Sequence, residues 1–107
     1  MKGFGGGLQQ MMRQANQMQS RIKKLQEELS EREFEGTAGG GAVTVKVNGD
    51  NKVLTLQIKP EVVNADDLEM LQDLIIVATN EAIKSAKDIS QQEMAKITGG
   101  MNFPGLF

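Results

Sequence analysis

The residue types that most often carry catalysis are missing from this sequence. There is no histidine and no cysteine, so the commonest general base, the thiolate nucleophile and the usual zinc ligands are absent. The densest group of carboxylates is Asp66, Asp67, Glu69 and Asp73. Acids are common at the start of a helix because the helix dipole favours them there. We therefore expect no catalytic residue, no metal site, no cofactor and no small-molecule substrate.

Three consecutive glycines, Gly39, Gly40 and Gly41, are the next candidate for chemistry. A phosphate-binding loop needs such glycines between a strand and a helix, followed by Lys and then Ser or Thr. Here the glycines precede an alternating apolar segment and no such pair follows. We interpret them as a turn between two strands.

Basic residues are concentrated at the start of the chain. Residues 1–26 contain five Lys or Arg and no acid, whereas residues 27–35 contain five Glu and one Arg. The whole chain is slightly acidic, with a net charge of −2 and a pI of about 5.1. Arg and Lys neutralise phosphates, and Gln or Asn bonds to phosphates or base edges. The basic segment is therefore suited to nucleic acid, and the competing interpretation is the solvated outside of a coiled coil.

A long helix over residues 8–29 must present these groups. Apolar residues recur there with heptad spacing, which indicates a helix packed along another helix. The seam positions are Leu8, Met11, Ala15, Met18, Ile22, Leu25 and Leu29. The outer positions are polar or basic: Gln9, Gln10, Arg13, Asn16, Gln17, Ser20, Lys23 and Lys24. The rod is about 37 Å long, and its seam pairs either with the helix of a second copy or with the second helix of the same chain.

Three short strands are expected after this helix. Residues 33–38, 43–47 and 54–58 alternate apolar and polar side chains, the pattern of half-buried strands. Phe34 points inward in the first strand. Residues 48–51, Asn-Gly-Asp-Asn, supply a hairpin turn. The last strand stops at Pro60.

A second helix completes an α+β fold. Asn64 or Asp66 caps its start, residues 85–88 could hold a break, and Gly99-Gly100 ends it. We expect a flexible, Gly-rich lead-in over residues 1–7, one domain over 8–98, and an apolar tail over 99–107. So short a chain buries little alone, which favours a core shared with a second copy. No signal peptide or membrane segment is evident, so the expected location is cytoplasmic.

Several segments, taken in order, resemble the YbaB/EbfC family of bacterial nucleoid-associated proteins. They are the Gly-rich start with its Gln- and Met-rich helix, EFEGTAGGGAVTVKVNG, IKPEVV, DLEMLQDLIIVATNEAIKSA and KITGGMNFPG. The resemblance covers nearly the whole chain, and the ordered set is specific although no single piece is diagnostic.

The resemblance implies an intertwined homodimer of α-β-β-β-α subunits, with a three-stranded antiparallel sheet and helices that project like tweezers. It also implies binding to double-stranded DNA with limited sequence preference, an altered DNA conformation, and roles in nucleoid organisation and gene regulation. The basic residues that would carry this role lie in the two helices: Arg13, Arg21, Lys23, Lys24, Lys84, Lys87 and Lys96. Lys87 and Lys96 have acidic sequence partners, Asp88 and Glu93, which weakens them as phosphate contacts.

A second interpretation remains open at this point. The chain would be a non-enzymatic coiled-coil adaptor that binds other proteins through its acidic body or apolar tail, with no DNA partner.

Overall fold

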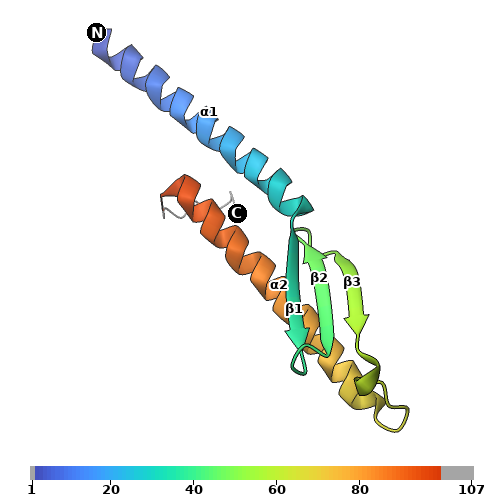
Figure 1. The fold of residues 1–107 in the computed structure, drawn as a ribbon. Helices are drawn as coiled ribbons and strands as arrows, with labels where there is room; N and C mark the ends of the chain where they lie inside the picture. The colour runs from blue at the N-terminus through green and yellow to red at the C-terminus, as the bar shows by residue number, and fades with distance from the viewer. Residues whose placement is uncertain (1, 100–107) are drawn as a thin grey trace.

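The computed structural model describes the backbone of residues 2–99 and the side chains of residues 7–99, and the expected tail beyond Gly99 lies outside them. These residues form a helix, a three-stranded sheet and a second helix (Figure 1). The expected α-β-β-β-α order is confirmed. The elements are α1 (Lys2–Glu31), β1 (Glu33–Ala38), β2 (Val43–Asn48), β3 (Val53–Ile58), the short 3-10 helix η1 (Pro60–Val62) and α2 (Leu68–Thr98).

The sheet is an antiparallel meander in the order β1-β2-β3. The three glycines form the β1–β2 turn as expected, and all three adopt positive φ angles. In the second turn, Oδ1 of Asn48 accepts hydrogen bonds from the backbone N–H of Asp50 at 2.9 Å and of Lys52 at 3.0 Å. Asn51 has a φ of 62° there, a conformation that Asn tolerates.

The core lies between α2 and the first two strands. Val43, Val45 and Val47 are completely buried, and Phe34 of β1 is buried beside them, as its position predicted. Small side chains line the facing side of α2: Ala78, Ala82 and Ala86. Their size lets the helix approach β1 closely, so that a Cβ at Gly36 would overlap backbone atoms of Ala78 and Ala82.

The third strand is much less covered than the other two. Leu56 pairs with Val45, so both side chains lie on the same face of the sheet. Val45 is fully buried, whereas Leu56 is 46% exposed because α2 packs across β1 and β2. Val53 and Leu54 are also exposed. We call this apolar, uncovered part of β3 the β3 face.

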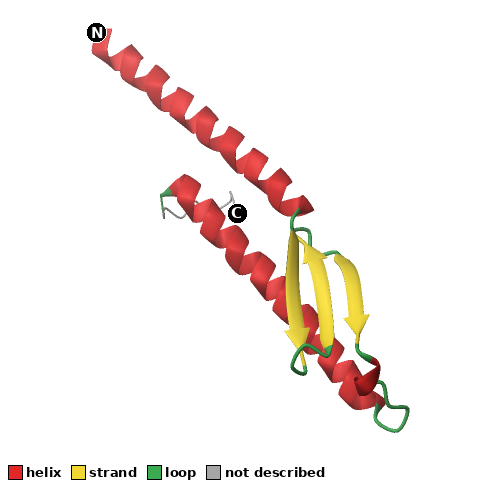
Figure 2. Ribbon diagram, in the orientation of Figure 1, coloured by secondary structure: helices red, strands yellow, loops and turns green. Residues whose placement is uncertain are grey.

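The heptad seam of α1 is divided into two halves. Ile22 and Leu29 are buried and Met18 and Leu25 are half-buried, since this half packs against α2. Leu8, Met11 and Ala15 are exposed, because α1 continues past the end of α2 (Figure 2). The described chain is consequently elongated, with extents of 80 × 20 × 19 Å.

Three local expectations differ from the structure. The first helix begins at Lys2 and includes Gly5, Gly6 and Gly7, although it was expected to start at Leu8. Each helical Gly costs about 1 kcal/mol relative to Ala, which discourages a helix without forbidding it. Residues 2–7, which were expected to form a flexible lead-in, are therefore continuous with α1 in their backbone.

The second helix also differs at its start and in its middle. Its N-cap is Asp67, whose Oδ1 accepts a hydrogen bond from the backbone N–H of Met70 at 3.2 Å. Asn64 instead accepts from the backbone N–H of Asp66 within the preceding turn. Residues 85–88 hold no break, and Gly99 ends the helix in the left-handed conformation as expected. None of the described helices has the length and apolarity that a membrane crossing requires.

Candidate nucleic-acid interface

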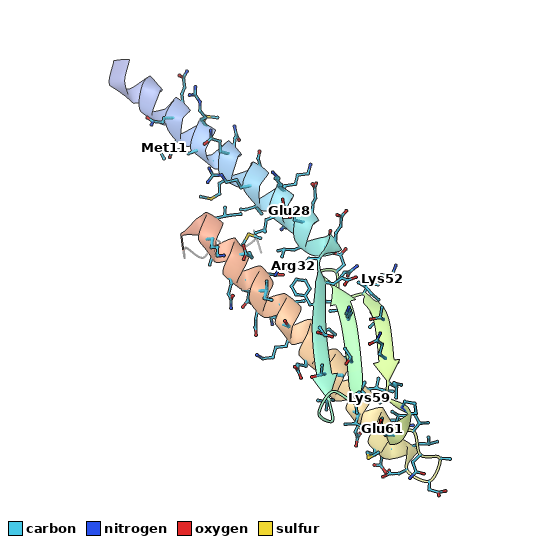
Figure 3. All side chains as sticks on the ribbon, viewed as in Figure 1. Met11, Glu28, Arg32, Lys52, Lys59 and Glu61 are labelled. Atoms are coloured by element: carbon cyan, nitrogen blue, oxygen red, sulfur yellow. The ribbon has the colours of Figure 1, made fainter. Side chains whose placement is uncertain are left out.

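The polar face of α1 lies opposite its apolar seam. Gln9, Arg13, Gln17, Ser20 and Lys24 follow one another at intervals of three or four residues, which places them in a row along a helix. All five are exposed. Figure 3 shows polar side chains projecting from this helix on the side away from α2. We call this row, with its neighbours Arg21 and Lys23, the basic face of α1.

A shallow hollow of about 940 Å³ follows the basic face. It is lined by Gln9, Met12, Arg13, Asn16, Gln17, Ser20 and Arg21. Arg13 and Arg21 are eight residues apart, which corresponds to about 12 Å along the helix axis. Amide and hydroxyl side chains fill the interval between them, so the hollow combines phosphate-binding charge with groups that donate and accept hydrogen bonds.

No acid shares this surface until the last two turns of α1. The two ion pairs among residues 7–99 lie within α2, so none of them involves Arg13, Arg21, Lys23 or Lys24. Glu27 is the first acid, and Glu28 and Glu31 follow it. Negative charge there repels phosphate, so the N-terminal two-thirds of α1 is the part suited to an anion.

The candidate lysines of α2 are placed differently. Lys84 Nζ lies 2.9 Å from Oδ2 of Asp88, and Lys96 Nζ lies 3.0 Å from Oε1 of Glu93. Sequence reasoning paired Asp88 with Lys87, which is wrong because adjacent residues on a helix do not face each other. Lys87 and Lys96 are about two and a half turns apart, on opposite sides of the helix. Among the described residues, therefore, Lys84 and Lys96 of α2 are each paired with an acid, whereas none of the four candidates of α1 takes part in an ion pair.

Some polar residues of the hollow were not among the candidate site residues of the sequence. Asn16, Gln17 and Ser20 line it together with the arginines. Their outer heptad positions could have identified them in the sequence. They were not selected because the candidates were chosen by charge alone.

Comparison with known proteins identifies the family. The sequence profile of the YbaB/EbfC DNA-binding family matches residues 4–101. The chain belongs to this family. A nucleoid-associated protein of Clostridium novyi is 52% identical over 98% of this chain and 94% of its own length. One from Alkaliphilus metalliredigens is also 52% identical, with the same coverage of both chains.

A solved structure extends the comparison to the fold. The crystal structure of an uncharacterized protein from Helicobacter pylori superposes with a TM-score of 0.67. The superposition covers 88% of this chain and 92% of the Helicobacter chain, and the two sequences are 24% identical. The helix-sheet-helix arrangement is therefore shared at low sequence identity.

Proposed function

We propose that this chain is a nucleoid-associated protein that binds double-stranded DNA, and that it contacts the DNA with the basic face of α1. The family match and the relatives named nucleoid-associated protein support the DNA partner. The observation that supports this DNA-contact surface is the row of exposed polar and basic residues over residues 7–26, a stretch without any acid. The proposed function needs no catalytic step, and it places the protein on the nucleoid in the cytoplasm.

The contact is mainly with phosphates. Lysine and arginine side chains on one helix neutralise phosphate charge without identifying bases. The amide groups between them bond to phosphates or base edges, but no described bidentate arrangement selects a base pair. Limited sequence preference follows from this composition. The acid-free residues 7–26 span about 30 Å along the helix, close to one turn of B-DNA at about 34–36 Å. By holding DNA over that length, the protein would alter DNA conformation and through it gene expression.

We also propose that the protein acts as a homodimer joined at the β3 face. Val53, Leu54 and Leu56 are 40–50% exposed on a strand at the edge of the sheet. Contiguous exposed apolar side chains on an edge strand favour association with a second chain. Two copies then present two basic arms, which doubles the number of phosphate contacts.

The experiment is a DNA-binding titration at several salt concentrations. Wild-type protein with about four phosphate contacts per dimer should give a slope of log K against log salt near −4. Arg13→Ala/Lys24→Ala removes two bases from each of the two copies. It should weaken binding to all sequences by a similar factor and bring the slope close to zero.

The matched control is Lys52→Ala/Lys59→Ala, which removes the same charge from exposed positions outside α1. It should bind nearly as wild type does. Equal losses in both double variants would contradict the assignment of α1. No binding of wild-type protein above about 100 mM salt would instead favour the adaptor interpretation.

A further inference from the structure

The row of residues on the basic face, from Gln9 to Lys24, has a cation on each side. Successive residues of an α-helix are rotated by about 100° around its axis. Relative to the mean direction of the row, Arg21 therefore lies about 80° to one side and Lys23 about 80° to the other. Both are exposed. Thus α1 has amide, hydroxyl and basic groups along a central line and a positive charge on each flank.

Within the described chain, no other element covers this row. The row lies opposite the seam, and α2 packs against the second half of the seam, where Ile22 and Leu29 are buried. Every residue from 7 to 17 is exposed, because α1 continues past the end of α2 (Figure 2). The N-terminal part of α1 is therefore a single bare helix, and the row is accessible from Gln9 to Lys24.

A bare α-helix matches the major groove of B-DNA in size. With its side chains it is about 10–12 Å in diameter. The major groove is about 12 Å wide, whereas the minor groove is about 6 Å wide. The floor of the major groove displays base edges, to which amide and arginine side chains bond, and its two walls are the phosphates of opposite strands. A central polar row with a cation on each flank is therefore complementary to this groove.

The change in charge along the row limits the length that enters the groove. Glu27 and Glu31 continue the row at the same spacing of three and four residues, so the polar side of α1 becomes acidic after Lys24. These carboxylates are repelled by the phosphate walls. From Gln9 to Lys24 the helix rises about 22 Å, which equals about six base pairs at about 3.4 Å each.

We propose that the row from Gln9 to Lys24 enters the major groove of DNA, with Arg21 and Lys23 on phosphates of opposite strands. This inference rests on the proposed function and adds the groove that α1 occupies. The helix leaves the groove at Glu27, so α2 and the sheet stay outside the duplex. Hydroxyl groups bond to several bases, so entry into the groove is compatible with limited sequence preference.

Filling one groove at a time tests the proposal. Wild-type protein is titrated at low salt with a short duplex, and with the same duplex in which every cytosine carries a glucosylated hydroxymethyl group at C5. The glucose occupies the major groove and should weaken binding about tenfold or more. Netropsin, which occupies the minor groove, should change the affinity for the unmodified duplex by less than about twofold.

The outcomes separate the groove from the function. Equal binding to both duplexes, or displacement of the protein by netropsin, would overturn the proposed groove and leave DNA binding itself established. Absence of binding to the unmodified duplex would instead overturn the proposed function, and this inference with it.

Two variants test which side of α1 enters the groove. Gln17→Glu places a carboxylate in the row, whereas Ala15→Glu places one about 160° around the axis, in the exposed half of the seam. Gln17→Glu should weaken binding about tenfold, because its charge faces phosphates and base acceptors. Ala15→Glu is the control and should weaken binding by less than about threefold. The difference should shrink on the glucosylated duplex, from which the row is already excluded.

Circular dichroism verifies that both variants keep the helical content of wild type. Equal losses of affinity in the two folded variants would overturn the proposed orientation of α1 in the groove.

Discussion

Gly36 of β1 lies directly against the backbone carbonyl of Ala78 in α2. A Cβ at position 36 would overlap that oxygen and the backbone N of Ala82. Backbone atoms of a packed helix cannot rotate away as a side chain can. This contact, together with Ala78 and Ala82 themselves, sets how closely the helix covers the sheet.

Gly36→Ala should therefore be strongly destabilising. Forcing a methyl group into a packed interface costs about 3 kcal/mol, which lowers the melting temperature of a domain of this size by about 10–20 °C. Thermal unfolding followed by circular dichroism measures the loss. A melting temperature within about 2 °C of wild type is less than the shift expected for 1 kcal/mol. That result would show that α2 can move away from β1 without loss of stability.

Gly7→Ala should have the opposite effect. Nothing lies within 4 Å of a Cβ at Gly7, which is exposed and within α1. Alanine loses less backbone entropy in a helix, so the exchange should stabilise α1 by about 0.5–1 kcal/mol. The helical signal in circular dichroism should rise slightly. A fall in helical signal would indicate that the first turns of α1 are not helical in solution.

The two halves of the heptad seam should differ in their contribution to stability. Leu29 is 6% exposed in the core, so Leu29→Ala should cost about 2–5 kcal/mol of unfolding free energy. Met11 is 67% exposed, so Met11→Ala should change the unfolding free energy by less than about 0.5 kcal/mol. Urea denaturation at low protein concentration compares the two. A large loss for Met11→Ala would mean that a partner covers this half within the folding unit.

Leu56→Asp should dissociate the proposed dimer without unfolding the chain. The side chain is already 46% exposed, but its charge would be buried when a second copy covers the β3 face. Thr55→Asp adds the same charge on the other face of the sheet and should leave the dimer intact. Sedimentation velocity distinguishes the two variants. Equal dissociation by both would exclude the β3 face.

The strands were predictable because their periodicity is local. Residues 33–38 alternate exposed and buried without exception, and β2 has the same regularity. Period-two patterning identifies a strand with one covered face whatever covers it. Neither the β1–β2 turn nor the order of elements depended on distant contacts, and both followed from glycine positions and segment lengths.

The partners of surfaces were not predictable in the same way. The seam over residues 8–29 reads as seven equivalent apolar positions, yet only its second half packs against α2. The difference depends on where α2 ends relative to α1, and a periodic sequence contains no such information. The prediction that Asn64 or Asp66 caps α2 was wrong for a related reason. Asn64, Asp66 and Asp67 are chemically similar, and the tertiary position of the turn selects Asp67 as the cap.

The candidate site was predictable in α1 and not in α2. In α1 no acid occurs before Glu27, so the sequence alone indicates that Arg13, Arg21, Lys23 and Lys24 have no acidic neighbour within one turn on their N-terminal side. In α2 each base has acids within four residues, and helical spacing decides which pairs form. Lys84 meets Asp88 because they are separated by one turn.

The order of elements along the chain also affects how the protein emerges from the ribosome. The buried faces of β1 and β2 are covered by α2, which is the last element of the domain. Forty residues, Lys59 to Thr98, separate the end of β3 from the end of that cover. At about 5–20 residues per second, synthesis leaves Val43, Val45 and Val47 without their helix for about 2–8 s. During this interval the apolar face of the nascent sheet has no cover, and its final packing is completed only after α2 has been translated.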